Sequence, residues 1–219
     1  MKISPIMREY LGEIYRLDRS VEGVTTSALA ERLDVSPSAV ARMLRRLDQA
    51  GLLTHIPYQG VKLSATGERE ALRSIRRHRL LEVFLVKVMG FGWDEVHEES
   101  HGLQLSISEA FEDRMDQVAG FPTHCPHGDP IPTKDGRMAS TNDKPLVELA
   151  VGAGAVLRRV KTEEGDKLRY LAELGLVPGV QLRVLGRAPF NGPLRIHANG
   201  NEHVIGTELA RSLRVEQVA

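Results

Sequence analysis

Histidine is concentrated in one part of the chain: five of the eight histidines lie between residues 78 and 127. His78 and Glu82 are four residues apart in a segment of helical periodicity, so both side chains project from one face of a helix. His97 and His101 repeat this spacing in the next segment. Imidazole and carboxylate together suit Mn, Fe, Co, Ni or Zn. The spacing therefore indicates a metal site.

A thiol and an imidazole meet in the motif Cys125-Pro126-His127, which contains the only cysteine of the chain. The proline restricts the backbone between these two donors, and the thiol shifts the preference toward softer ions. Each donor pair has an alternative, because a His–Glu pair at this spacing is often a surface ion pair and a buried cysteine is often part of a core. The concentration of all these donors favours a metal site that joins separate elements and can act as a conformational switch.

The residues before this cluster have the pattern of a winged helix-turn-helix. Residues 6–17 have helical periodicity, and a second helix is expected to begin after Thr26-Ser27. A third begins at Ser36-Pro37-Ser38, with a serine cap and a proline in its first turn, and ends at Gly51. Two short strands follow, over 53–58 and 61–64. This order predicts a DNA-binding unit whose third helix enters the major groove.

The third helix begins with small side chains, which allow a helix to approach base edges closely. Arg42 lies one turn further on the same face and is expected to reach a guanine. The strand pair offers an aromatic and a basic side chain to phosphates or the minor groove. The alternative is a winged helix that binds protein. The residues expected to face DNA are Ser36, Pro37, Ser38, Ala39, Arg42, Arg46, Tyr58 and Lys62.

The formal net charge of +0 conceals a gradient along the chain. Residues 1–77 hold 13 Lys and Arg against 9 Asp and Glu, whereas residues 93–118 hold 8 acids and one arginine. A basic front end suits an anion and an acidic segment suits a cation. One cysteine excludes an internal disulfide framework, and neither a membrane span nor a signal peptide is recognisable. We therefore expect a soluble cytoplasmic protein.

Helices are expected over residues 66–89, 93–106 and 108–119, followed by a loop and linker over 120–145. From residue 146 short strands alternate with glycine-rich turns, which predicts a small β-barrel with one short helix that ends at Gly175. The fold class is α+β. The expected domains are a winged helix-turn-helix over 1–74, a helical metal-binding and dimerisation domain over 75–140 and the barrel over 146–219.

The stretches HRLLEVFL, VHEESHGLQLSISEAFEDRM and CPHGDPIP resemble the metal-binding core of the diphtheria toxin repressor family, which includes iron- and manganese-responsive members. YLAELGLVPG, PFNGPLRI and ELARSLRV are similar to the FeoA-type barrels of its longer members. The resemblance implies a first metal site, with one ligand from the barrel at the acid that precedes the YL motif. Its implied ligands are His78, Glu82, His97, Cys125, His127 and Asp166.

The resemblance also implies a second metal site, built from Glu9 on the first helix together with His101 and Gln104. Here the sequence departs from the family pattern. His101 stands where relatives carry Cys or Glu, Gln104 replaces a Glu and Leu105 replaces a His. Because leucine cannot bind a metal ion, this second site is expected to be weakened, or to be completed by a neighbouring acid such as Glu13 or Glu99, a backbone oxygen or water.

These expectations combine into a homodimeric, metal-activated repressor that binds a pseudo-palindromic DNA operator and controls genes of metal homeostasis. Mn(II) is the expected ion and Fe(II) the alternative, because a carboxylate on the first helix suits a hard ion. Dimerisation is expected through Leu80, Leu81, Phe84 and Leu85. The chain is not expected to be an enzyme. Two alternatives stay open: a metal-binding adaptor whose winged helix binds protein, and a metallohydrolase.

Overall fold

The computed structural model describes residues 3–18, 23–56, 58 and 60–218. The chain divides into two compact units. The first consists of residues up to Leu81 together with Ser100–Met115 and Ile131–Ala139. The second consists of Glu82–Glu99, Asp116–Pro130 and the residues from Ser140 onward. Each unit has its own hydrophobic core.

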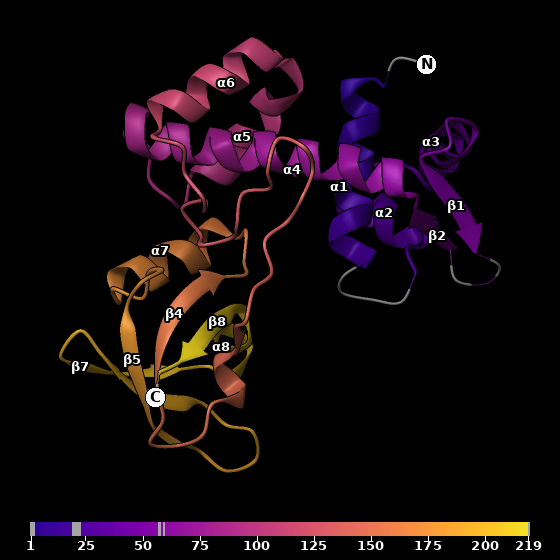
Figure 1. Cartoon of the computed structure of the whole chain (residues 1–219). Helices are drawn as coiled ribbons and strands as arrows, with labels where there is room; N and C mark the ends of the chain where they lie inside the picture. The colour runs from indigo at the N-terminus through magenta and orange to yellow at the C-terminus, as the bar shows by residue number, and fades with distance from the viewer. Residues whose placement is uncertain (1–2, 19–22, 57, 59, 219) are drawn as a thin grey trace. The chain divides into compact units, whose positions relative to one another are not determined.

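The first unit begins with helices α1 (Pro5–Asp18), α2 (Thr26–Arg32) and α3 (Pro37–Gln49), followed by the antiparallel hairpin of β1 (Leu53–Ile56) and β2 (Gly60–Leu63) (Figure 1). This order confirms the winged helix-turn-helix. Part of the expected connection between the strands, residues 57 and 59, lies outside the described residues.

Helix α3 begins where the sequence predicts, after the Ser36 cap, whereas α2 begins at Thr26, two residues earlier than expected, with Thr25 as its cap. The Thr25 hydroxyl accepts a hydrogen bond from the Ala28 amide at 3.1 Å, and the Ser36 hydroxyl accepts one from the Ala39 amide at 3.3 Å. Both bonds satisfy amides that the first turn of a helix leaves without a partner. The apolar faces of the three helices then share one core, which includes Leu11, Leu29 and Leu47.

The chain continues into α4 (Ala65–Phe84), α5 (Val96–Leu103) and α6 (Glu109–Val118). The helix expected over 66–89 is α-helical only as far as Phe84, and a π-helical turn over Leu85–Met89 ends it at Gly90. Gly90 has φ +79°, a left-handed conformation that suits a helix end. The helix expected from residue 93 begins at Val96 and continues into a 3-10 turn over Gln104–Ser106.

Two arginines of α4 converge on one carboxylate of α6. Arg76 Nε lies 3.3 Å from Glu112 Oε1, and Arg77 Nε donates to Glu112 Oε2 at 3.1 Å. Arg76 also donates to the Pro132 carbonyl at 2.9 Å. Because Arg76 and Glu112 are both buried, these paired charges fix α6 and the following segment against α4 within the first unit.

The prediction that Leu80, Leu81, Phe84 and Leu85 form the dimer surface is wrong for three of these four residues. Leu80, Leu81 and Leu85 are 0%, 3% and 6% exposed, so they are already buried within one chain. The sequence could not separate this burial from burial by a partner, because both require an apolar stripe.

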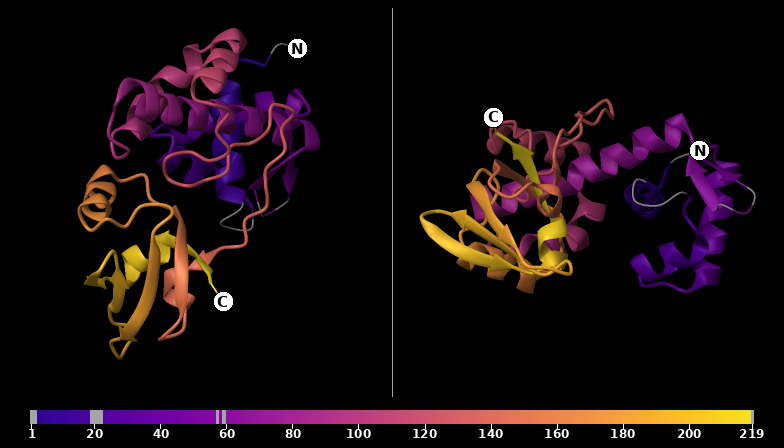
Figure 2. Two further views of the ribbon diagram at one scale, coloured as in Figure 1. Left: turned by 60° about the vertical axis from the view of Figure 1, so that its left-hand side comes forward. Right: turned by 90° about the horizontal axis from the view of Figure 1, so that it is seen from below.

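The second unit contains an antiparallel sheet of six strands in the order β3-β8-β4-β5-β6-β7 (Figures 1 and 2). Its strands, which correspond to the small barrel expected from the sequence, are β3 (Lys144–Pro145), β4 (Gly154–Val160), β5 (Gln181–Arg187), β6 (Leu194–Ala198), β7 (Asn201–Ile205) and β8 (Leu213–Gln217). The register shifts between Leu157 and Arg159 and again between Val184 and Gly186. Such irregularities increase the twist and curvature of a sheet.

Two helices accompany this sheet. Helix α7 (Gly165–Glu173) places Leu168 and Leu171 in the core of the second unit, and Gly175 follows its end as expected. Helix α8 (Thr207–Ser212) leads directly into β8. The sequence pattern did not reveal α8, β8 or the short β3. Among the described residues, no helix combines the length and apolarity that crossing a bilayer requires.

Candidate metal centre and nucleic-acid interface

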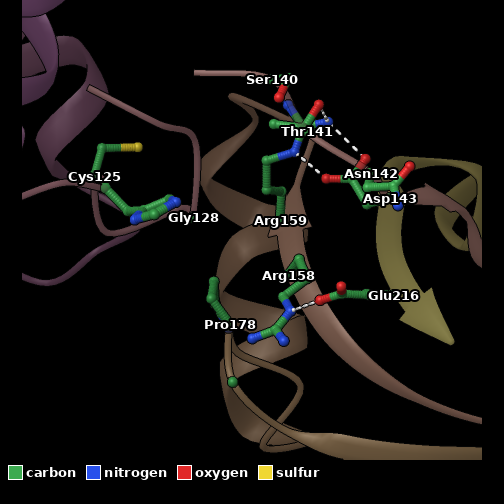
Figure 3. Close-up of a pocket in the computed structure, with 12 residues that line it drawn as sticks. Cys125, Gly128, Ser140, Thr141, Asn142, Asp143, Arg158, Arg159, Pro178 and Glu216 are labelled. Atoms are coloured by element: carbon green, nitrogen blue, oxygen red, sulfur yellow. Dashed lines mark hydrogen bonds and ion pairs between the residues drawn. The ribbon is translucent and has the colours of Figure 1, made fainter. Parts of the chain in front are cut away.

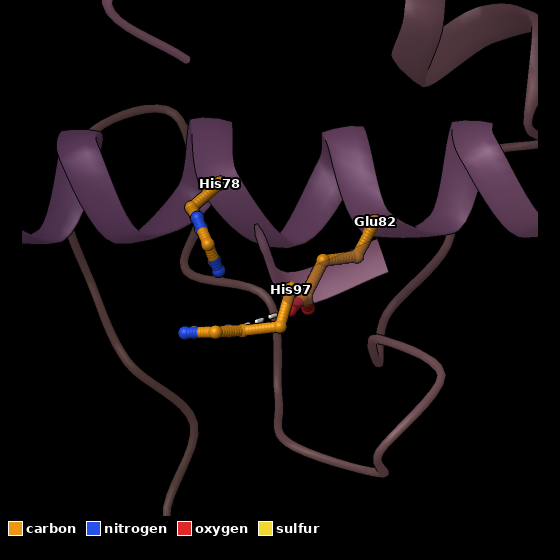
Figure 4. Close-up of side chains that lie close together, drawn as sticks. All are labelled: His78, Glu82 and His97. Atoms are coloured by element: carbon orange, nitrogen blue, oxygen red, sulfur yellow. Dashed lines mark ion pairs between the residues drawn. The ribbon is translucent and has the colours of Figure 1, made fainter. Parts of the chain in front are cut away.

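The carboxylate of Glu82 occupies the middle of the histidine-rich region. Glu82 and His78 lie one turn apart on α4, and they are only 3% and 4% exposed. His97, from the first turn of α5, approaches the same carboxylate, with its Nδ1 3.5 Å from Glu82 Oε1. The ligand atoms of these three residues all lie within 4.8 Å of one another (Figure 4). The spacing noted in the sequence thus brings three donors together.

A second group shares the same carboxylate. The ligand atoms of Glu82, Cys125 and His127 lie within 4.8 Å of one another, and all three residues are buried. His127 Nδ1 lies 3.7 Å from Glu82 Oε1. Two ligands on opposite sides of an ion at bonds of about 2.0–2.3 Å are separated by about 4–4.6 Å. Both groups therefore have the dimensions and the donor types of a metal site.

The orientation of His127 is fixed from its other nitrogen. Nε2 lies 2.8 Å from the Trp93 carbonyl oxygen, to which it donates, and the imidazole ring stacks on the Trp93 indole with centroids 5.6 Å apart. This bond puts the proton on Nε2 and turns Nδ1 toward Glu82. A backbone carbonyl that holds the remote nitrogen of a histidine is a common feature of protein metal sites.

The pKa of His127 depends on its burial and on its acidic neighbour Glu82. Burial alone would lower the pKa of the imidazole, but contact with the Glu82 carboxylate outweighs burial and leaves the pKa of His127 above its ordinary value. The buried negative charge of Glu82 thus attracts a compensating positive charge. A metal cation is one such charge.

The acid of the C-terminal part that lies near this cluster differs from the acid that the sequence predicted. The Asp166 side chain is 95% exposed and pairs with Arg169 at 2.6 Å. Glu163 Oε2 instead lies 3.5 Å from His97 Nε2. The segment TEEGDK holds three acids within four residues, and helix α7 begins at Gly165 between them. Sequence spacing could not decide among these acids because the turn before α7 sets their directions.

The three residues proposed for a second metal site also lie together. His101 Nε2 is 3.3 Å from Glu9 Oε1, and His101 Nδ1 is 3.3 Å from Gln104 Nε2. Burial is the largest cause of a raised pKa at Glu9, and the nearby Glu13 raises it further while His101 opposes it. Glu13 itself pairs with Arg16 and, at 2.9 Å, with Arg32. Glu13, one of the two acids suggested to complete this group, therefore already has two cationic partners.

The residues expected to face DNA are nearly all on the surface. Ser36, Pro37, Ser38, Arg42 and Arg46 are exposed along α3, and Ala39 is half-buried beside them. The Ser36 and Ser38 hydroxyls lie 3.1 Å apart, and the Ser36 hydroxyl also caps the helix. A capping serine has less freedom to bond DNA, which leaves Ser38 and Arg42 as the more available polar groups.

The hairpin residues of the expected interface are also exposed. Tyr58 is 108% exposed at the tip and has φ +63°, and Lys62 is exposed on β2. A fully exposed tyrosine in a left-handed conformation is uncommon in a protein surface. Its position suits a side chain that becomes covered on binding another molecule.

Together, a winged helix-turn-helix and a cluster of buried metal-ligating side chains define the class of metal-responsive DNA-binding regulators. Three family models match successive parts of the chain. They are the N-terminal DNA binding domain of iron dependent repressors (residues 2–61), their metal binding and dimerisation domain (64–133) and the FeoA domain (144–217).

Individual relatives agree along nearly the whole length. The iron-dependent repressor IdeR of Mycobacterium tuberculosis (strain ATCC 25618 / H37Rv) is 34% identical over 224 residues, which cover 95% of this chain and 96% of the relative. The diphtheria toxin repressor of Corynebacterium diphtheriae is 26% identical over 221 residues, again 95% and 96% of the two chains. The chain belongs to the diphtheria toxin repressor family of metal-dependent transcriptional repressors.

Solved structures extend this agreement to three dimensions. A manganese-dependent transcriptional repressor in complex with manganese superposes with a TM-score of 0.91 at 35% identity, over 96% of this chain and 99% of that one. The repressor ScaR with bound Cd2+ superposes with a TM-score of 0.82 at 32% identity, over 97% and 99%. The family resemblance seen in the sequence motifs is confirmed.

Proposed function

We propose that the chain is a homodimeric repressor activated by Mn(II), with Fe(II) as the alternative ion, and that it controls genes of metal homeostasis from the cytoplasm. The observation that carries this proposal is the buried Glu82 carboxylate, which contacts imidazoles of α5 and of the Cys125–His127 loop. The repressor identity of the relatives supports a regulatory role without enzymatic activity.

We propose that the first metal site is formed by His78, Glu82, His97, Cys125 and His127, with Glu163 as the carboxylate from the C-terminal part. When bound, the ion supplies two positive charges and a fixed set of bond directions. Glu82 is shared between the two groups of donors, so it links α4, α5 and the Cys125–His127 loop. Glu9, His101 and Gln104 would hold an ion at the second, more exposed site.

The donor set supports Mn(II) with Fe(II) as the alternative. Glu82, Glu163 and Glu9 offer carboxylate oxygens, which suit a hard ion such as Mn(II). Cys125 offers a thiolate, which favours softer ions. Relatives of both kinds occur, since they include the iron-dependent repressor IdeR and a manganese-dependent transcriptional repressor.

Helix α6 offers a surface for a second copy of the chain. Phe111 and Val118 are seven residues apart on α6, hence on one face, and they are 49% and 52% exposed. Leu103 at the end of α5 is 48% exposed. We propose that this face takes the dimerisation role that the sequence assigned to Leu80, Leu81 and Leu85. The proposed domains remain residues 1–74, 75–140 and 146–219.

A twofold dimer would present two copies of α3 to a pseudo-palindromic operator. Arg42 is the residue we propose for base recognition, because it is exposed one turn into α3. Arg42→Ala is expected to cost about 1–3 kcal/mol and to relax specificity at one operator position. Lys62→Ala should instead weaken binding to all sequences and reduce the salt dependence. Equal effects of the two changes would contradict this assignment.

The direct test measures how Mn(II) changes the affinity of the protein for DNA. Duplexes selected from a random library in the presence of Mn(II) are labelled, and their affinity is measured by fluorescence anisotropy across a Mn(II) titration. The wild-type protein should tighten with Mn(II), and Glu82→Gln should not. Glu98→Gln, at an exposed acid of α5, is the matched control and should respond like the wild type. Metal-independent DNA binding by the wild type would overturn the proposal, and no duplex binding at all would favour an adaptor.

A further inference from the structure

The Cys125–His127 loop is attached to strand β4 of the C-terminal sheet. The Val160 amide donates to the His127 carbonyl at 2.9 Å. Gly128 has φ +87°, and a Cβ atom there would lie only 2.0 Å from the Arg158 carbonyl oxygen. The loop backbone therefore touches the strand so closely that no side chain fits between them. The position of two proposed metal ligands is thus set by β4.

One buried side chain of β4 extends this attachment to the rest of the second unit. Arg159 is 8% exposed, and its Nη1 donates to Asp129 Oδ1, directly after the loop, at 2.8 Å. Nε and Nη2 each donate to the Asp143 carboxylate at 2.6 Å, and Nη2 also donates to the Thr141 hydroxyl at 3.2 Å (Figure 3). A single guanidinium thus joins the loop to the segment that precedes the sheet.

Asp143, at the other end of this network, is itself held by further hydrogen bonds. The Asp143 side chain is 4% exposed and also accepts a hydrogen bond from Arg214 Nε of β8 at 2.9 Å. Although burial tends to raise it, the two guanidinium groups hold the pKa of Asp143 below its ordinary value. Charge-assisted bonds of this kind are short, directional and stronger than neutral ones. Arg159 is therefore fixed from the sheet side and presents Nη1 to Asp129.

We infer that Arg159 is a positioning residue for the metal centre: by holding Asp129 it keeps Cys125 and His127 directed at Glu82. This inference rests on the proposed function, because it assumes that these side chains bind the ion. A planar guanidinium can bridge two carboxylates at fixed angles, which a lysine ammonium cannot do as rigidly. Among the described residues, the neighbouring Arg158 pairs with Glu216, and both of these side chains are nearly half exposed.

The first test uses the protein without added metal. Cys125 is the only cysteine, and a pocket of about 540 Å³ lined by Cys125, Gly128, Arg158 and Arg159 gives a reagent a path to it. The rate of reaction with a disulfide reagent such as DTNB therefore reports on this loop alone. Arg159→Met and Asp129→Ala should each raise the rate about tenfold or more, since each removes a charge-assisted bond. Arg195→Met, at an exposed arginine of β6 that pairs with Glu202 and does not line this pocket, should leave the rate unchanged.

The second test uses Co(II), whose bond to a thiolate gives a charge-transfer absorption. The wild type should show this band, Arg159→Met and Asp129→Ala should bind Co(II) with a weakened band, and Arg159→Lys should restore part of it. Equal thiol rates and equal bands in wild type, Arg159→Met and Asp129→Ala would overturn the inference. If Arg159→Met does not fold, Asp129→Ala decides, because it leaves the Arg159–Asp143 pair intact.

The proposed function and the proposed role of Arg159 can be overturned separately. A wild-type protein that binds no Co(II) or Mn(II) would overturn the proposed function, whatever the thiol rates show. A wild type with a normal thiolate band, together with an unaltered Asp129→Ala variant, would overturn only the role of Arg159.

Discussion

Two groups of potential ligands in this chain differ in how the structure surrounds them. The Glu82 cluster consists of His78, Glu82, His97, Cys125 and His127, and four of these five residues are buried. The Glu9 cluster consists of Glu9, His101 and Gln104, and the His101 side chain is 52% exposed. The first cluster draws on three segments of the chain and is supported from outside by the Trp93 carbonyl and by β4.

This difference has an energetic consequence. A carboxylate as buried as Glu82 has lost most of its hydration, so a nearby positive charge stabilises it strongly. At the Glu9 cluster the His101 side chain is open to water, which screens its charge, and one of the three side chains is a neutral amide. We therefore expect the Glu82 cluster to dominate metal-dependent stability and the Glu9 cluster to modulate it.

We expect the largest effect when the stabilisation by Mn(II) is compared between Glu82→Gln and Glu9→Gln. At a hundredfold excess of Mn(II) over its dissociation constant, the ion should stabilise the wild type by about 2.7 kcal/mol. Glu82→Gln should abolish this gain because it removes the shared ligand, and Glu9→Gln should retain most of it. Urea denaturation with and without Mn(II) measures both. Equal losses in the two variants would end the distinction between the clusters.

The next effect concerns the acid of the C-terminal part. Glu163→Gln should weaken Mn(II) binding about tenfold, or about 1.4 kcal/mol, because a carboxylate near His97 is lost. Asp166→Asn, three residues later, should leave the affinity unchanged because that side chain is 95% exposed. Isothermal titration calorimetry with Mn(II) separates them. The reverse outcome would restore Asp166 as the ligand.

A smaller effect should follow from Gln104→Glu, which gives the Glu9 cluster a second carboxylate. We expect a second ion to bind several-fold more tightly, because a charged ligand replaces a neutral amide. Without metal the same change should destabilise the protein, because Gln104 is only 7% exposed and its replacement buries a carboxylate. Metal content after dialysis and apo-protein melting check the two halves of this prediction. An unchanged metal stoichiometry would show that the cluster cannot form a site.

The smallest effect is a pH dependence at Glu9. Its pKa is raised in the folded protein from the ordinary value of 4.5, mainly by burial, so the folded state binds the proton more tightly than the unfolded state. The stability from this proton is fully present below pH 4.5 and is lost as the pH rises through the folded-state pKa. Glu9→Gln should remove this decline. Apo-protein stability at several pH values between 4 and 7 tests it, and parallel curves for both proteins would argue against it.

Local signals predicted the winged helix-turn-helix well. Ser36 caps α3, Pro37 begins it and Gly51 follows its end, and all of these signals act over a few positions. The hydrogen bonds that satisfy a helix end come from residues next to it in sequence. Elements without such signals, such as α8 and the short β3, were not predicted because packing against the rest of the sheet stabilises them.

The donor types and the His78–Glu82 spacing were set by the sequence alone, because a helix fixes which residues share a face. The residue types also pointed to the Cys125-Pro126-His127 motif, and the family resemblance added the Glu9 cluster. Only the tertiary structure decided that Glu163 rather than Asp166 approaches His97, that Leu80 and Leu81 are covered within their own chain, and that Arg159 holds the loop. Each of these depends on side chains from distant segments, whose directions are fixed by packing and by buried charge rather than by local spacing.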